Sequence, residues 1–439
     1  MRKLILLLCL SGLFFYYANA DEKAEITDIF NRHECLSCHI NQSHASSGKT
    51  IQVSMRDVEL GMRYFDMWQM YNGLQQNGLI NEPSLAKLLV AINKNSLKHQ
   101  QTNNKYAKQG LNAAATQILK NWIMTESQKY NEGAEIADKF KGDFIRPITQ
   151  SFVIDEAKAQ LGEKLFHNTK LSFDDTVSCA SCHSIWSGGD DGLDVAVGVD
   201  GAKGTINAPT VLNAAYNIAF FWDGRAVDLA DQASKPPMNP VEMASYSWDQ
   251  IIDKLKEDTV LTAAFNNVYP DGITADNITN AISEFEKTLI TPNSRFDQYL
   301  KGDENALNEQ EKQGYALFKQ YQCNTCHVGE AMGGQSYEYM GRAHNYFADR
   351  NKKMIFEDDG RFNITNQPYD RHKFKVPTLR NIALTAPYFH DAHAKTLEDA
   401  VKITLTYETN AEINEAEVEQ IVAFLKSLTG EYKEKQLKP

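Results

Sequence analysis

Apolar residues recur at three- and four-residue steps in several segments of the chain, the spacing that places them on one face of an α-helix. Ile282, Phe285 and Leu289 follow this spacing, and residues 418–428 show the same pattern. Segments with the alternating pattern of a β-strand are few. The pattern therefore predicts a mainly α fold.

The predicted helices follow a repeated plan, in which one helix leads into a cysteine-containing segment and another closes the unit. The leading helices are predicted at residues 24–31, 155–166 and 308–320, and the closing helices at 114–123, 278–289 and 418–428. Taken alone, their apolar stripes indicate core faces rather than cofactor sites. Pro147 and Pro292 interrupt the pattern between units, where we expect linkers.

The first twenty residues differ in character from the rest of the chain. Arg2 and Lys3 precede an apolar run at residues 4–17, and a small-x-small sequence, residues 18–20, ends it. This arrangement predicts a secretory signal peptide at residues 1–20 and export to the periplasm. The alternative is a retained membrane anchor, but the run is shorter than the ~20 residues that span a bilayer.

The six cysteines outside the predicted signal form three pairs of the type Cys-x-x-Cys-His, the attachment site of a c-type haem. Two thiols one helical turn apart can each bond a vinyl group of the same porphyrin, and the next residue offers its imidazole to the iron. The cysteines are Cys35 and Cys38, Cys179 and Cys182, and Cys323 and Cys326; the proximal iron ligands are His39, His183 and His327.

Three other kinds of site use paired cysteines: disulfides, redox dithiols and zinc sites. Disulfides do not require a histidine after each pair. A thioredoxin-like dithiol explains one copy better than three, and zinc could use the same residue types. The repeated pentapeptide favours three covalently bound haem c groups.

The first cysteines of the three motifs are spaced by 144 residues in both intervals, as Cys35, Cys179 and Cys323 show. This period is too long for a solenoid repeat and fits domains in tandem. We therefore predict three cytochrome c-like helical domains, each around one haem: residues 21–145, 146–293 and 294–439.

The composition and net charge of the chain limit its structural class and the kinds of partner that it can bind. The 439 residues carry a formal net charge of −12, with 42% hydrophobic and 23% charged residues. These fractions exclude a fibrous or wholly disordered chain. An acidic surface repels nucleic acid and attracts basic proteins.

Further segments accompany the second and third haem motifs: residues 161–166, 188–191, 207–210, 221–226, 241–243, 295–297, 377–381 and 385–390. In these segments and motifs, residues 152–429 resemble the bacterial dihaem cytochrome c peroxidases. The additional N-terminal haem unit makes the whole chain similar to the trihaem subgroup of that family.

The resemblance implies that the second and third predicted domains have different roles. The haem of residues 146–293 would perform the peroxide chemistry, and the haem of residues 294–439 would relay electrons. Glu242 takes the place of the catalytic carboxylate with Gln232 beside it, and Trp222 matches the tryptophan between the two haems. The family's calcium site points to Asn207, Thr385 and Pro387.

The role of Glu242 also has a chemical argument. Cleavage of a peroxide needs a proton taken from one oxygen and delivered to the other, which a single positioned carboxylate can do. Glu242 follows a proline-rich stretch with few charges, where partial burial would raise its pKa. Local sequence alone favours a solvated glutamate at this position and a core residue at Trp222, and the family motif reverses the preference for Glu242.

The sequence departs from the family at the sixth iron ligands. Val199 stands where much of the family has a histidine, which predicts an open peroxidatic iron that needs no reductive activation. Thr404 stands where a methionine or tyrosine is expected, with Tyr407 nearby. The other candidates for the third haem are Met332, Met340 and Met354. His99 is the first candidate for the N-terminal haem, ahead of Met55, Met62, Met67, Met70 and Met124.

These observations predict an exported cytochrome c peroxidase that reduces hydrogen peroxide to water through c-type haems. A basic cytochrome c would be its electron donor, or a quinol if the signal is kept as an anchor, and no nucleic acid partner is expected. The resemblance allows a homodimer. The alternatives are a MauG-like enzyme that oxidatively matures a partner protein, and a multihaem electron carrier without catalysis.

Overall fold

The computed structural model describes residues 24–30, 81–93, 111–149 and 152–438. The chain divides into two compact units, Met1–Gly133 and Ala134–Pro439. Both are helical where described, as the apolar periodicity predicts. None of the helices in the described ranges combines the length and apolar character that a membrane crossing requires.

The described part of the first unit contains a helix at residues 24–30, α5 (Glu82–Asn93) and α7 (Ala113–Tyr130). The side chain of Asn112 caps α7 by accepting a hydrogen bond from the Ala115 amide at 2.8 Å. Phe30 and Trp122 are fully buried and meet edge to face, with ring centroids 6.3 Å apart. The predicted helix at residues 114–123 is confirmed, and the one predicted at 24–31 is confirmed over its described residues, 24–30.

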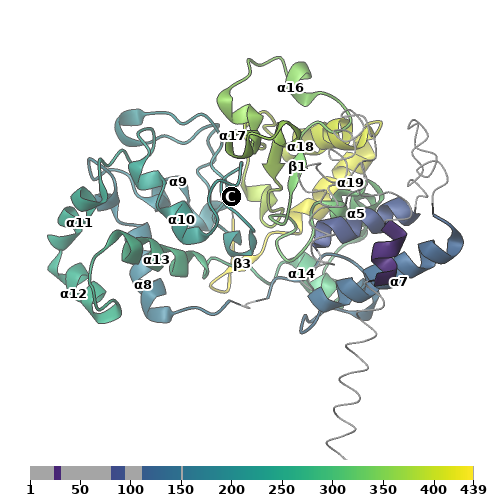
Figure 1. Cartoon of the computed structure of the whole chain (residues 1–439), viewed down its shortest axis with the longest axis horizontal. Coiled ribbons are helices and arrows are strands. Elements are labelled where there is room, and N and C mark those ends of the chain that lie inside the picture. Colours follow the sequence, from purple (N-terminus) through teal and green to yellow (C-terminus); the bar gives the residue numbers. More distant parts are fainter. Residues whose placement is uncertain (1–23, 31–80, 94–110, 150–151, 439) are drawn as a thin grey trace, which may run out of the picture. The chain divides into compact units, whose positions relative to one another are not determined.

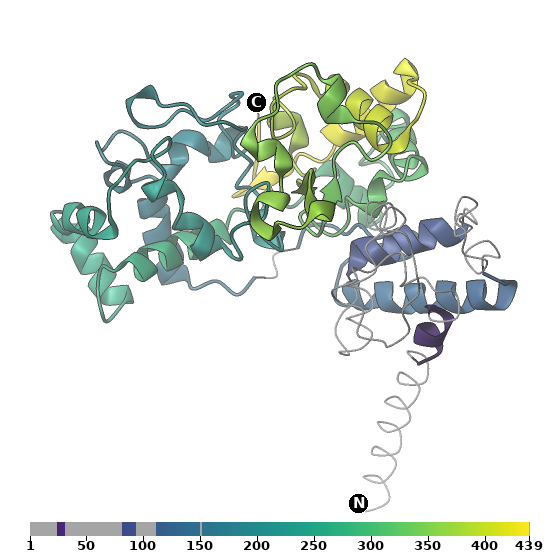
Figure 2. The ribbon, with the colours of Figure 1, turned by 45° about the horizontal axis from the view of Figure 1, so that its top comes forward.

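The second unit contains two hydrophobic cores, each built on a pair of helices. In the first core, α8 (Glu156–Phe166) packs along α13 (Ala275–Glu286), which Figure 1 and Figure 2 show from two directions. The remaining helices of this half are α9 (Cys179–Cys182), α10 (Leu229–Ala233), α11 (Trp248–Lys256) and α12 (Thr259–Val268).

In the second core, α15 (Glu309–Gln320) packs along α19 (Glu415–Lys426). Ile136, Phe140 and Ile145 join this core. The other helices of this half are α14 (Arg295–Leu300), α16 (Tyr346–Asp349), α17 (Phe362–Thr365) and α18 (Leu397–Thr404), which a π-helical turn at Leu405–Thr409 continues.

Strands are short in the described residues. β1 (Tyr337–Tyr339) pairs antiparallel with β2 (Lys373–Lys375), with Tyr337 opposite Lys375. β3 (Glu431–Tyr432) pairs antiparallel with β4 (Lys435–Gln436) near the C-terminus. Tyr432 and Leu437 pack against the first core, so the end of the chain returns to the half that contains α8 and α13.

The same close contact brings the helices together in both cores. A Cβ atom at Gly162 of α8 would lie 1.9 Å from the carbonyl oxygen of Ala281, and one at Gly314 of α15 would lie 1.9 Å from that of Gln420. Each glycine also faces a phenylalanine, Phe285 or Phe424. Glycine is therefore required at both crossings, and the two halves of the unit share one helical plan. The domain boundaries themselves stay a prediction.

Candidate active site

A cavity of about 660 Å³ lies in the second unit and contains elements of two Cys-x-x-Cys-His motifs. Cys182 and His183 of one motif line it, and so do Cys323 and His327 of the other. The fold thus brings together two motifs that are 144 residues apart in the sequence. The N-terminal motif, Cys35, Cys38 and His39, lies outside the described residues.

The backbone fixes the orientation of both histidines. Nδ1 of His183 lies 3.1 Å from the carbonyl oxygen of Gly189, and Nδ1 of His327 lies 2.9 Å from that of Met332. A proton on Nδ1 donates to the carbonyl and leaves Nε2 free to bind a metal. Burial lowers the pKa of His183 and of His327, which keeps each ring neutral, as a ligand must be.

The cysteines fit a covalent haem better than the alternatives. Cys179, Cys182, Cys323 and Cys326 form no disulfides. Burial raises the pKa of Cys179 to about 12 and that of Cys182 to about 11, whereas a reactive dithiol needs a lowered thiol pKa. Within the described ranges, no cluster of three potential metal-binding side chains occurs. Free thiols beside an oriented imidazole are the donor set of a c-type haem.

Glu242 lines the cavity that contains His183. A tight turn after the short 3-10 helix Pro236–Met238 places it, because the Glu242 amide donates to the carbonyl of Asn239 at 3.0 Å. The side chain of Asn239 donates to Oε1 of Glu242 at 2.6 Å. Burial raises the pKa of Glu242, and the nearby Arg225 and the Asn239 hydrogen bond offset this only in part.

The loop at Gly198 and Val199 is tied to the backbone of Glu242. The Val199 amide donates to the Glu242 carbonyl at 2.8 Å, and a Cβ at Gly198 would lie 2.2 Å from that same oxygen. Val199 is 4% exposed and packs in the first core. The described histidines that line the cavity are His183, His327 and His390, and none belongs to this loop.

Trp222 and Gln232 also line the cavity, so the structure places both with Glu242. Gln232 lies on α10. Trp222 is held through main-chain atoms: its indole Nε1 donates to the carbonyl of Asn207 at 2.9 Å, and its own carbonyl accepts from the Lys375 amide at 2.8 Å.

The three residues suggested for calcium, Asn207, Thr385 and Pro387, line the same cavity. The side-chain nitrogen of Asn207 donates to the carbonyl of Leu193 at 2.9 Å, which leaves its amide oxygen available. Ala386 and Pro387 are joined by a cis peptide bond. Oxygen atoms of this type are the ligands that calcium prefers.

Thr404, on α18, lines the cavity together with His327. The other candidates for a sixth ligand lie elsewhere. Met332 is fully buried in the second core, Met340 packs against the cluster of Tyr346, Phe347 and Phe374, and Met354 is 42% exposed. Thr404 therefore lines the cavity with His327, whereas none of the three methionines lines it.

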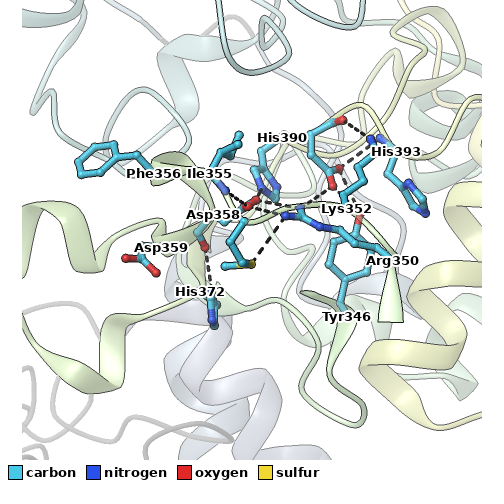
Figure 3. Close-up of polar contacts among 12 residues, drawn as sticks. Tyr346, Arg350, Lys352, Ile355, Phe356, Asp358, Asp359, His372, His390 and His393 are labelled. Carbon is cyan, nitrogen blue, oxygen red and sulfur yellow. Dashed lines mark hydrogen bonds and ion pairs between the residues drawn. The ribbon is translucent and has the colours of Figure 1, made fainter. Parts of the chain in front are cut away.

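A buried polar cluster supports His390 (Figure 3). His390 lines the cavity, and its ring centroid lies 6.3 Å from that of Trp222. His390 Nε2 and Asp358 Oδ1 are 2.8 Å apart, and Arg350 bridges Asp358 and Asp391. Burial acts to raise the pKa of Asp358, but hydrogen bonds from His390 and Arg350 outweigh it and lower the pKa. His390 was found in the sequence only as part of a family motif, without a role.

Glu286, at the end of α13, is a cavity residue that sequence reasoning missed. It is 4% exposed, and its Oε2 has no hydrogen-bond partner. Burial raises its pKa to about 8, so the side chain is protonated at neutral pH. One signal was present in the sequence, because Glu286 follows Ile282 by four residues and so shares the apolar face of the predicted helix. His99, the candidate for the N-terminal haem, lies outside the described residues.

Comparison with known proteins assigns the chain to a family. The family model of di-haem cytochrome c peroxidase matches residues 156–305. The chain is 39% identical over 441 residues to the cytochrome c peroxidase Ccp of Escherichia coli K12, covering 96% of this chain and 94% of that protein. It is 46% identical over 289 residues to the cytochrome c551 peroxidase of Nitrosomonas europaea, covering 65% and 84%.

The fold has a matching solved relative. The crystal structure of a MauG-like protein associated with microbial copper homeostasis matches with a TM-score of 0.58 and 29% identity, over 66% of this chain and 94% of that one. The chain thus belongs to the di-haem cytochrome c peroxidase family. It carries covalently bound c-type haem and is a peroxidase, as the sequence predicts.

Proposed function

We propose that the chain is a periplasmic peroxidase with three haems, which reduces hydrogen peroxide to two waters with two electrons and two protons. The observation that carries the proposal is the shared cavity: His183, Glu242 and Trp222 line it together with the His327 site. The mature protein would begin after the signal at residues 1–20, which agrees with the oxidising compartment where c-type haems reside.

Cys179 and Cys182 would hold the peroxidatic haem with His183 as its iron ligand, and Cys323, Cys326 and His327 would hold the second. The third, in the N-terminal unit, would use Cys35, Cys38 and His39. When bound, the peroxidatic haem supplies the iron that binds peroxide and the electrons that reduce it.

Glu242 would move the proton that cleavage of the peroxide requires. A carboxylate takes the proton from one oxygen and returns it to the other, and this is most effective when its pKa lies near the working pH. Burial raises the pKa of Glu242 toward that range, while the Asn239 hydrogen bond at 2.6 Å holds the carboxyl group in place. Gln232 would bind the substrate beside it.

The distal side of the peroxidatic site would be open from the start. The residue that stands in the position of a blocking histidine is Val199, whose side chain is buried in the core and whose amide is bound to the Glu242 carbonyl. Peroxide would therefore reach the site without a prior loop movement.

The haems held at His183 and His327 would supply electron transfer to the peroxide site, with Trp222 between them. The haem held by Cys35, Cys38 and His39 would supply the entry point for electrons from a basic cytochrome c, which the net charge of −12 would attract. A quinol is the alternative donor if the signal remains as an anchor. Calcium bound by Asn207, Thr385 and Pro387 would join segments of the two halves, and two copies of the chain could form a homodimer.

The test is peroxide turnover by Glu242→Gln, with Glu257→Gln as a control at a surface glutamate that pairs with Lys170. We expect Glu242→Gln to lose at least 100-fold in turnover, the lower range for general acid–base catalysis. Haem content should stay at three per chain, and Glu257→Gln should match the wild type. Unchanged turnover in Glu242→Gln would assign the proton transfer to another group.

The same preparations test the open site. Cyanide added to the oxidised wild type should bind one haem before any reductant is present. A spectrum that responds to cyanide only after reduction would show that a side chain blocks the iron.

One observation favours a second function. Thr404, rather than a methionine, lines the cavity with His327, and the matching crystal structure is of a MauG-like protein. A haem without a sulfur ligand has a lower potential, which suits oxidative maturation of a partner protein. Fast turnover with small reduced donors would count against this function.

A further inference from the structure

Lys375 is a buried lysine in the cavity that holds Trp222. It ends β2 and is 8% exposed, and it lines the cavity with Trp222 and Phe374. Its amide donates to the Trp222 carbonyl, so the backbone of this residue is fixed beside the tryptophan.

The ammonium group of Lys375 has no acidic partner among the described residues. Burial lowers its pKa to about 8, and no opposite charge offsets that effect. By contrast, Lys373 on the same strand is 6% exposed and pairs with Asp370 at 3.5 Å. A buried cation that lacks a partner is costly and normally neutralises or acquires one.

The acidic residues that line the cavity do not act as a counter-ion for Lys375. Asp223 pairs with Arg225 at 3.0 Å, Glu357 accepts from Thr205 at 2.6 Å, and Glu242 accepts from Asn239. The remaining acid, Glu286, is subject to burial alone and exerts no effect on Lys375. The missing partner is therefore an anion that the described part of the chain does not provide.

We propose that Lys375 is the counter-ion of a haem propionate, a carboxylate of one of the two haems that share this cavity. This inference rests on the proposed occupation of the cavity by haem. A haem brings two carboxylates into its site, and a desolvated ammonium is the group that binds one as a charge-assisted hydrogen bond. Lys375 would thereby position a haem edge next to the main chain that fixes Trp222.

The pairing of Lys375 with a propionate would also raise the midpoint potential of that haem. A lysine that neutralises a propionate favours the reduced iron, because reduction removes a positive charge from the haem. Loss of the lysine leaves an uncompensated carboxylate, which favours the oxidised iron and lowers the midpoint potential of that haem.

The experiment is a spectroelectrochemical titration of the full-length holoprotein in the wild type, Lys375→Met, Lys375→Arg and Lys373→Met. We expect Lys375→Met to keep the wild-type haem-to-protein ratio, because attachment is covalent, and to show a lowered midpoint potential in one haem. The spectrum of the haem that shifts identifies which of the two supplies the carboxylate. Lys375→Arg and Lys373→Met should keep the wild-type potentials.

Wild-type potentials for every haem in Lys375→Met would overturn the proposal. If that variant does not fold, the infrared carboxylate band of ¹³C-labelled propionates decides: it should differ between the wild type and Lys375→Arg, and an identical band overturns the proposal. The haem count and peroxide turnover of the wild type test the proposed function separately, so failure of one does not imply failure of the other.

Discussion

Glu242 and Glu286 are two of the glutamates that line the cavity, and burial raises the pKa of both, yet their surroundings differ. Glu242 accepts a hydrogen bond from Asn239 and is influenced by Arg225, whereas Oε2 of Glu286 has no partner. Glu242 is thus suited to exchange protons, while Glu286 stays protonated until the pH approaches its raised pKa of about 8.

Glu286 should make stability depend on pH. Its pKa rises from 4.5 to about 8 on folding, so the folded state holds a proton that the unfolded state has released within that range. The free energy of unfolding therefore decreases as the pH rises from 4.5 to 8, by up to about 1.4 kcal/mol per pH unit from this group. Below pH 4.5 Glu286 is protonated in both the folded and the unfolded state, so it does not make the free energy of unfolding depend on pH.

We expect Glu286→Gln to remove this dependence. Urea unfolding at pH 5 and pH 8 should give a smaller difference between the two midpoints in Glu286→Gln than in the wild type. Glu163→Gln, at a glutamate 46% exposed on α8, serves as the control and should keep the wild-type difference. An unchanged difference in Glu286→Gln would place the titration elsewhere.

At the scale of elements, polar caps decided how well helices could be predicted. Asp155 and Asn308 begin the predicted helices, and both cap the observed ones, α8 and α15, through their side chains. The helix predicted at residues 278–289 instead begins three residues earlier, because Thr274 caps α13 by accepting from the Asn277 amide. Apolar spacing alone located the core face but not the helix ends.

The glycine at each helix crossing leads to a stability prediction. Gly162→Ala would place a Cβ in the position of the Ala281 carbonyl, so α8 and α13 must move apart. Overpacking of this kind typically costs 1–3 kcal/mol, and we expect about 2–3 kcal/mol here.

Chemical denaturation of the holoprotein would measure this loss. Gly204→Ala is the control, because its added Cβ would lie 3.5 Å from the nearest atom, the carbonyl oxygen of Ala196. Equal stability of Gly162→Ala and the wild type would mean that the crossing can widen without loss of packing.

At the scale of the molecule, spacing predicted that there are repeated haem units but not that two of them share one cavity. Glu242 and Trp222 came from family motifs, since nothing in their local sequence separates a proton carrier from a solvated glutamate. The roles of Lys375 and Glu286 could not be predicted from the sequence. Each role depends on which residues the fold places next to the side chain. His390 acquires its setting only when Arg350 and Asp358 pack beneath it.

The net charge leads to a prediction about the donor. With −12 on the chain, association with a basic cytochrome c should be fast at low salt and slow as ionic strength rises. Between 0.01 M and 0.15 M the Debye length shortens from ~30 Å to ~8 Å, so we expect the second-order rate constant to fall by at least tenfold.

Stopped-flow mixing with a reduced basic cytochrome c would measure this rate constant. The control is an uncharged reduced dye, whose rate constant should not depend on salt. A cytochrome c rate that is unchanged or rises with salt would exclude electrostatic attraction as the basis of donor choice.

The manner in which Trp222 is held has a consequence for how the chain can change over generations. Each hydrogen bond that fixes this residue ends on a main-chain atom, of Asn207 or of Lys375. A point mutation replaces side chains but leaves carbonyls and amides in place, proline excepted. Mutations at the neighbouring positions could therefore change the charge and volume around the indole ring while Trp222 keeps its position.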